Sequence, residues 1–200
     1  MIIDHCIQGS PEWFEKRIGN PGASSFSQIV TSTGKRSSTR TAFLNTMAGE
    51  TLLGKKEESY SDSNMQRGTE LEPEARVLFE MVTGLDVEEV GLCYRDQLKQ
   101  FHVSPDGLIK GQNKGLELKC PKLGTHIGYL NKNKLPTTYT CQVQGSLMCT
   151  GYDSWYFMSY YPGLKPFLIE VKRDEELISI LSNEINKFCV ELNLLVKKLK

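Results

Sequence analysis

Residues 104–121 combine an acid in a turn with a charged pair inside an apolar segment. Asp106 lies in the turn sequence SPDG, and Glu117 and Lys119 lie further along in GLELKC. Side chains alternate along an extended strand, so Glu117 and Lys119 project from one face while Leu118 points to the other. A turn between antiparallel strands can bring Asp106 beside Glu117. Two carboxylates would then converge on one point, next to a lysine.

Such a pair of carboxylates suits a hard divalent cation. Mg²⁺ is bound by one or two carboxylates plus waters and substrate phosphate, and the backbone carbonyl of Leu118 could supply a further oxygen. Mn²⁺ could substitute. A metal there would polarise a phosphodiester and lower the pKa of a bound water. Lys119 could position or deprotonate that water and offset charge on the phosphate.

Each motif also has an ordinary structural explanation. An aspartate in SPDG is most often a turn former, and a Glu-x-Lys pair on a strand is most often an exposed ion pair worth under about 1 kcal/mol. Here, however, Glu117 and Lys119 alternate with Leu116, Leu118 and Cys120 in an apolar strand. Buried charge is costly unless it binds something, so the setting favours a functional site.

The composition predicts one soluble domain spanning residues 1–200. The chain has 39% hydrophobic residues, enough for the core of one domain. It has 24 basic and 24 acidic residues, so its net charge is zero and does not indicate a nucleic-acid or membrane partner. Its six cysteines form no CxxC pair, which argues against zinc and favours a reduced, cytoplasmic protein. No apolar run approaches the roughly 18 residues of a membrane span, and no signal peptide is evident.

Hydrophobic periodicity and turn residues predict helices, a meander of strands, and further helices and strands. The second helix would be capped by Ser24 or Ser25. The helices are expected over residues 10–17, 24–32, 41–53, 65–82, 137–149 and from about 175 onward, and the strands over 87–95, 100–104, 107–111, 115–120, 154–161 and 166–173.

An aspartate followed at short distance by Glu-x-Lys is the signature of the PD-(D/E)xK nuclease superfamily. The words SPDG, LELKCP, GTELEPEARVLFEMVTG, YTCQVQGSLMCTG and WYFMSYYP further resemble the YqaJ-type, lambda exonuclease-like alkaline exonucleases of phage recombination. The resemblance covers roughly residues 10–175. It implies an α/β (α+β) fold with a central mixed β-sheet flanked by helices.

The resemblance also implies roles for individual residues. Asp106 and Glu117 would bind Mg²⁺ with the Leu118 carbonyl, Lys119 would be the catalytic lysine, and Glu72 would support the metal site. A glutamine pair, Gln142 and Gln144, would lie near the active site. From periodicity alone, Glu72 and the two glutamines are equally well explained as polar helix residues.

The family implies an activity and an assembly. Its members digest one strand of duplex DNA from 5′ ends, release mononucleotides and leave a 3′ overhang for a single-strand annealing protein. The resemblance further implies a ring-shaped homotrimer, encoded by a phage or prophage and acting in the cytoplasm of a bacterial host. The match is loose after about Lys172, in the region that would contribute to trimer contacts.

Two other functions are compatible with the same core. An endonuclease or structure-specific resolvase would use the same metal-binding residues and would differ only in polarity and in its need for a DNA end. A DNA-binding subunit without catalysis would not require Asp106, Glu117 and Lys119 together. Their presence argues against that second alternative.

The resemblance predicts a pocket for a terminal 5′ phosphate. Arg17 aligns with a family arginine and would bind phosphate through two hydrogen bonds. Ser24 at a helix N-terminus, Ser104 and Gln142 would complete the pocket. A surface arginine and a plain N-cap serine are the alternative explanation.

Met65, just before the glutamate helix, is a candidate wedge for strand separation. An apolar side chain can unstack a base step at a few kcal/mol. Packing of Met65 against its own domain explains the residue as well.

Overall fold

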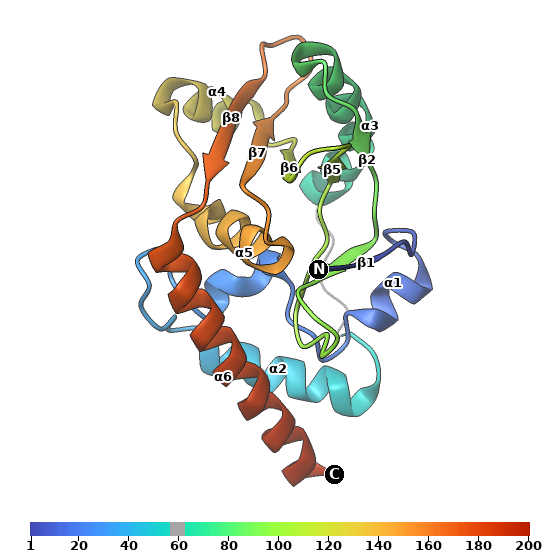
Figure 1. The fold of residues 1–200 in the computed structure, drawn as a ribbon, viewed down its shortest axis with the longest axis vertical. Coiled ribbons are helices and arrows are strands. Elements are labelled where there is room, and N and C mark those ends of the chain that lie inside the picture. The colour runs from blue at the N-terminus through green and yellow to red at the C-terminus, as the bar shows by residue number, and fades with distance from the viewer. Residues whose placement is uncertain (57–62) are drawn as a thin grey trace.

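A five-stranded mixed sheet lies in the upper half of the molecule as drawn in Figure 1. The computed structural model describes residues 1–56 and 63–200, with side chains described outside residues 57–66. The strand order is β2-β5-β6-β7-β8, in which β6 and β7 are parallel and the other neighbours antiparallel. The strands are β2 (Val87–Glu88), β5 (Gly107–Ile109), β6 (Lys114–Lys119), β7 (Ser154–Ser159) and β8 (Phe167–Lys172). The predicted central mixed sheet is therefore confirmed.

The expected meander is divided between two sheets. β1 (Ile2–Asp4), β3 (Leu92–Tyr94) and β4 (His102–Val103) form a separate antiparallel sheet in the order β1-β3-β4. The single strand expected over residues 87–95 is wrong, because the chain turns at Gly91 between β2 and β3. The Gly91 N–H donates to the Asp4 carbonyl at 3.0 Å, and a Cβ at Gly91 would overlap the carbonyl of Cys6. The N-terminal segment thus requires a glycine at this turn.

Helices surround both sheets. They are α1 (Pro11–Lys16), η1 (Ala23–Gln28), α2 (Arg40–Leu53), α3 (Ser63–Thr83), α4 (Leu123–Lys132), η2 (Thr137–Tyr139), α5 (Thr140–Thr150) and α6 (Glu175–Leu199). The helix expected over residues 24–32 is a short 3₁₀ helix, η1, whose N-cap is Gly22, so capping by Ser24 or Ser25 is wrong. α4 was not predicted, because its N-cap residue, Lys122, makes no side-chain capping bond.

The two faces of the larger sheet are covered by different helices. Phe79 of α3 shares one hydrophobic cluster with Leu116 and Leu118 of β6. Leu147 of α5 and Phe157 of β7 belong to another, which extends to η1, α2 and α6. Glu117 therefore alternates with two leucines that face α3, and it faces α5 itself.

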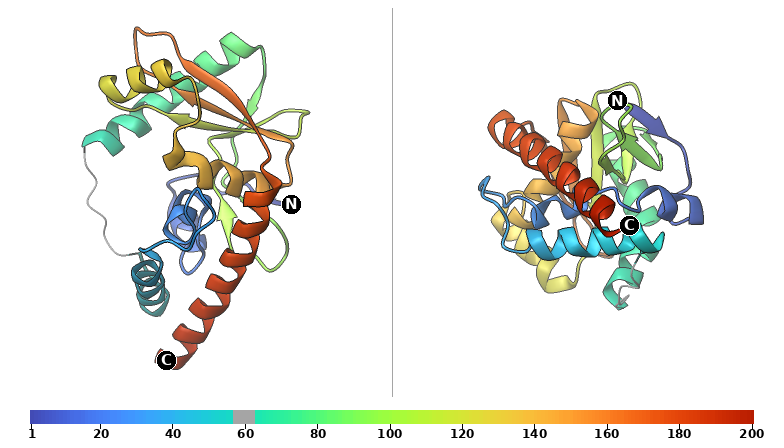
Figure 2. Two further views of the ribbon diagram at one scale, coloured as in Figure 1. Left: turned by 90° about the vertical axis from the view of Figure 1, so that its left-hand side faces the viewer. Right: turned by 90° about the horizontal axis from the view of Figure 1, so that it is seen from below.

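α6 runs from the end of β8 past α2, and its C-terminal part extends away from the sheet (Figures 1 and 2). Arg40 of α2 forms an ion pair with Glu191 of α6 at 2.7 Å, and the rings of Phe43 and Phe188 stack with centroids 5.4 Å apart. These contacts stabilise the packing of α2 against α6. In the part of the chain that the structure describes, no helix is long and apolar enough to cross a membrane.

Candidate active site

The segment before β5, which bends at Asp106 and forms no turn, places Asp106 directly against β6. The Asp106 N–H donates to the Leu116 carbonyl at 3.2 Å, and the Asp106 carboxylate accepts from the Leu118 N–H at 2.6 Å. Because β5 and β6 are antiparallel neighbours joined through residues 110–113, their pairing brings Asp106 next to Glu117, as the sequence predicts. The two carboxylates come together although ten residues separate them in the chain.

Glu117 is buried, with 1% of its surface exposed, and both Lys119 and Gln142 contact it. Its Oε1 forms an ion pair with the Lys119 ammonium and accepts a hydrogen bond from Gln142 Nε2 at 2.6 Å. Its Oε2 is buried and has no hydrogen-bond partner among the described residues. A buried carboxylate oxygen without a partner is unfavourable unless a ligand occupies the position.

The site disfavours negative charge. Burial, with a further contribution from Asp106, raises the pKa of Glu117 to about 7, against the opposing effects of Lys119 and Gln142. Burial and the charge of Asp106 likewise raise the pKa of Glu72 to about 7. Burial also raises the pKa of Asp106. Burial lowers the pKa of Lys119, but the negative charges of Glu117 and Asp106 outweigh this effect and raise it overall.

Arg76 connects α3 to the site, and sequence reasoning did not identify it. Its guanidinium donates to Glu72 at 2.8 Å and to the Asp106 backbone carbonyl at 3.1 Å, and it pairs with Glu89 at 2.9 Å. The i,i+4 spacing of Glu72 and Arg76 was the available signal. Arg76 therefore holds Glu72 on the same side as Asp106.

A cavity of about 270 Å³ lies beside these groups. Its walls come from residues 5–8, from residues 89–91 and from Glu72, Arg76 and Asp106. The side-chain amide of Gln8 donates to the carbonyls of Val90 and Pro105, at 2.8 Å each, and so fixes the N-terminal wall. No sequence pattern indicated that the N-terminal segment lines the site.

Arg17 lies in a second polar cluster connected to the first. Its guanidinium stacks over Trp13 at 3.8 Å from the ring centroid, and its Nε–H donates to His102 at 3.2 Å. The Trp13 indole N–H donates to the Ser104 hydroxyl at 3.0 Å, and that hydroxyl donates to the Gly91 carbonyl at 2.9 Å. Ser104, two residues before Asp106, therefore joins the two clusters. Trp13 and His102 were not identified from the sequence.

Two of the predicted residues lie away from Glu117. Ser24 is exposed in the first turn of η1. Gln144 donates to the Lys172 carbonyl and accepts from the Asp174 N–H, at 2.9 Å each, so it holds the start of α6. Residues two apart on a helix do not share a face, and of the glutamine pair only Gln142 contacts Glu117. The backbone of Met65 is in the first turn of α3, and its side chain lies outside the described residues.

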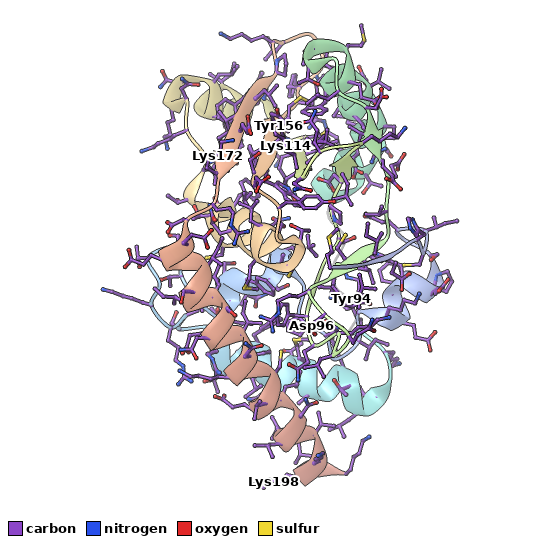
Figure 3. All side chains as sticks on the ribbon, viewed as in Figure 1. Tyr94, Asp96, Lys114, Tyr156, Lys172 and Lys198 are labelled. Atoms are coloured by element: carbon purple, nitrogen blue, oxygen red, sulfur yellow. The ribbon has the colours of Figure 1, made fainter. Side chains whose placement is uncertain are left out.

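Lys114, at the opposite end of β6 from Lys119, belongs to a different cluster. Lys114 contacts Tyr156 at 3.4 Å, and both lie close to Lys172 in Figure 3. Lys114 pairs with Glu170 at 3.2 Å, and Glu170 also pairs with Lys172. In this cluster two lysines share the one carboxylate of Glu170, and the cluster takes no part in the candidate site.

The residues present fit a hard divalent cation. Among the described residues, no group of three or more His, Cys, Asp or Glu side chains could hold a metal ion. Mg²⁺ does not require such a group, since it keeps several waters and uses one or two carboxylates. The unpartnered oxygen of Glu117 and the raised pKa values of the buried Glu117 and the half-buried Asp106 are what such a cation would relieve.

The sheet order, the flanking helices and the acidic site together define a nuclease fold. Solved structures with this fold include an alkaline exonuclease, LHK-Exo, from Laribacter hongkongensis, with 32% identity, a TM-score of 0.86 and coverage of 95% of this chain and 96% of that one. The same enzyme in complex with dAMP matches with 34% identity, a TM-score of 0.86 and 96% coverage of each chain. A phage-related exonuclease from Haemophilus somnus 129PT has the same fold at 17% identity, with a TM-score of 0.73, covering 90% of this chain and 96% of that one.

The model of the YqaJ-like viral recombinase domain matches residues 12–153. The chain belongs to this family, as its sequence motifs indicated. None of the curated proteins compared with the chain matches it.

Proposed function

We propose that the protein is a Mg²⁺-dependent exonuclease that degrades one strand of linear duplex DNA from its 5′ end. It would release mononucleotides and leave 3′ overhangs. The observation that carries the proposal is the buried Glu117 carboxylate, which adjoins Asp106 and Lys119 and keeps one oxygen without a partner among the described residues. Similarity to an alkaline exonuclease over 95% of the chain supports the reaction class.

Asp106 and Glu117, with the Leu118 carbonyl, would hold the metal. When bound, the metal would polarise the scissile phosphodiester and lower the pKa of a water molecule. Mn²⁺ accepts the same oxygen ligands and can substitute. Glu72 would act on the site through Arg76, which binds both Glu72 and the Asp106 carbonyl.

Lys119 would act as a cation. Because Glu117 and Asp106 raise its pKa, its ammonium group stays protonated beside the carboxylates. A protonated lysine can orient a water through its N–H donors and offset charge that develops on the phosphate. Both roles open from the sequence, orientation of the water and its deprotonation, stay part of the proposal.

The test is digestion of a linear duplex labelled separately at each end, with a closed circle as control. We expect Mg²⁺-dependent release of mononucleotides from 5′ ends and no cleavage of the circle. Cleavage of the circle would instead identify an endonuclease, and release from 3′ ends would contradict the proposed polarity.

A terminal 5′ phosphate would bind at Arg17. Burial lowers the pKa of Arg17, against the effect of the charge of Glu50. Its Nε–H is occupied by His102, and its two terminal amino groups form no hydrogen bond with the described residues, so they can present a planar fork to phosphate oxygens. Ser104 and Gln142 currently donate to Gly91 and Glu117, so each would have to exchange that bond to contact the phosphate. Ser24 is exposed and would join from η1.

The pocket predicts a preference for phosphorylated ends. We expect the enzyme to digest 5′-phosphorylated duplex faster than 5′-hydroxyl duplex, because Arg17 supplies two charge-assisted hydrogen bonds. Arg17→Ala should erase this difference mainly by slowing the phosphorylated substrate. A preference that survives in Arg17→Ala would show that the phosphate binds elsewhere.

The protein would act as a ring-shaped homotrimer that passes its product strand to a single-strand annealing protein. Met65 would separate the strands at the duplex end. These assignments follow the family resemblance.

A further inference from the structure

Every hydrogen-bond role in the cluster around Arg17 can be assigned. Arginine can only donate, so His102 Nε2, 3.2 Å from Arg17 Nε, must be the acceptor. His102 Nδ1 therefore carries the proton and donates to Asn20 Oδ1 at 3.1 Å. The Asn20 amide orientation agrees with this, because its Nδ2 donates to the Lys99 carbonyl at 2.6 Å. A single tautomer of His102 satisfies all of these contacts.

The fold holds the imidazole in place on several sides. His102 is buried, with 1% of its surface exposed, and its N–H donates to the Pro21 carbonyl at 3.2 Å. Gly22 packs so closely that a Cβ there would lie 2.8 Å from His102 Nε2. Burial, and after it the charges of Arg17 and Lys56, keep the pKa of His102 well below its ordinary value. The ring is therefore neutral.

We propose that His102 is a positioning residue for the terminal phosphate. It accepts from the Arg17 Nε–H and so holds the guanidinium over the ring of Trp13, with the two terminal amino groups facing the substrate. The inference rests on the phosphate pocket proposed above. His102 fixes one edge of the guanidinium and Trp13 fixes its face, so the planar group loses its freedom to rotate.

A neutral acceptor suits this role better than a carboxylate. An aspartate or glutamate at this position would hold Arg17 equally well, but it would cancel the positive charge and compete with the phosphate. The imidazole orients Arg17 without adding a negative charge to that of Glu50, which already acts on Arg17. The arrangement also explains why a buried, neutral histidine adjoins this arginine.

The test compares the rates of digestion, as kcat/KM, of 5′-phosphorylated and 5′-hydroxyl duplexes. His102→Leu, which has no acceptor, should reduce the ratio of the two rates about tenfold or more, because a misplaced binding group loses most of its effect. His102→Gln, whose amide oxygen can accept from Arg17, should keep most of the ratio. In an Arg17→Ala background, His102→Leu should leave the ratio unchanged, because His102 acts only through Arg17.

Asn20→Ala provides an independent route if His102→Leu does not fold, as judged by thermal unfolding. Without Asn20 the imidazole proton can move to Nε2, where it would face the Arg17 donor, so the ratio should fall in this variant too. A wild-type ratio in folded His102→Leu or Asn20→Ala, or an equal loss on both substrates, would overturn the positioning role alone. Absence of any preference in the wild type, or its survival in Arg17→Ala, would overturn the phosphate pocket and this inference with it.

Discussion

At the level of single residues, the burial of ionisable groups distinguishes the candidate site from an ordinary surface ion pair. Glu117 is almost inaccessible to solvent, yet it is placed beside a second carboxylate and one lysine. An exposed Glu-x-Lys pair would contribute little to stability and would require no ligand. The observed pair is instead held in a setting that raises the pKa of Glu117 to about 7, which is typical of functional sites.

Glu117→Gln should separate function from folding. The amide keeps the shape but removes the negative charge, so activity should fall by a factor on the order of 10³ or more. The unfolding temperature at alkaline pH should stay the same or rise, because the fold disfavours the charged carboxylate. Glu170→Gln, in the separate cluster on β8, is the matched control and should keep its activity. Near-normal hydrolysis by Glu117→Gln would contradict the metal assignment.

Stability and metal binding should depend on pH in opposite ways. Glu72 and Glu117 have folded-state pKa values raised to about 7 from 4.5. Their contribution to stability is therefore complete below about pH 4.5 and is lost as the pH rises through about 7. Mg²⁺ binds the deprotonated carboxylates, so it should stabilise the protein increasingly over the same interval.

Thermal unfolding with and without Mg²⁺, measured between about pH 5 and about pH 8, tests this expectation. The rise in unfolding temperature caused by Mg²⁺ should grow with pH and should be largely lost in Asp106→Asn. A rise that is independent of pH would indicate that Mg²⁺ binds at another place.

At the level of elements, close backbone contacts determine how the helices meet. Gly145 lies in the buried helix α5, and a Cβ there would overlap the ring of Phe26 in η1. This contact brings η1 against α5, the helix that carries Gln142. Because Gly145 has no side chain, η1 can pack this closely against α5.

Two helix glycines should respond in opposite directions to alanine. Gly145→Ala should destabilise the protein by about 1–3 kcal/mol, because the added methyl overpacks the contact with Phe26. Gly128→Ala in α4 meets nothing within 4 Å, so the better helix propensity of alanine should stabilise it by roughly 0.5–1 kcal/mol. Denaturant unfolding measures both. Equal effects of the two substitutions would refute the packing argument.

At the level of the whole molecule, five of the described helices carry exposed apolar side chains. They are Phe14 of α1, Leu52 and Leu53 of α2, Val77, Met81 and Val82 of α3, Leu123 and Ile127 of α4, and Val190, Leu194 and Leu199 of α6. Exposed apolar residues are common on monomers as well. In a homotrimer, part of this surface would be covered.

Sedimentation should show a particle of three times the 22.6 kDa chain mass. A closed ring keeps the enzyme on its DNA, so the trimer should also continue digestion after excess unlabelled competitor DNA is added. A stable monomer at working concentration would contradict the assembly and would make processive digestion implausible, since no ring would retain the substrate.

The central chemistry could be predicted from the sequence because it is local. The antiparallel pairing beside Asp106 and the alternation of Glu117 and Lys119 with leucines depend on neighbouring residues in one hairpin, and the structure reproduces both, although SPDG forms a bend and no turn. The helices with clear periodicity, such as α3 and α6, were predicted for the same reason. α4 has no capping signal, and the strand over residues 87–95 breaks at a contact with the N-terminal segment, so these elements were missed or merged.

The sequence by itself determined the family and the pair of carboxylates with their lysine, because short motifs encode them, and the mixed sheet followed from the resemblance to that family. Only the tertiary structure decided what surrounds that pair. Arg17 and His102 are 85 residues apart, and Glu117 and Gln142 are 25 residues apart. Contacts between such distant segments depend on how helices pack against the sheet, and no local pattern specifies which side chains will meet there.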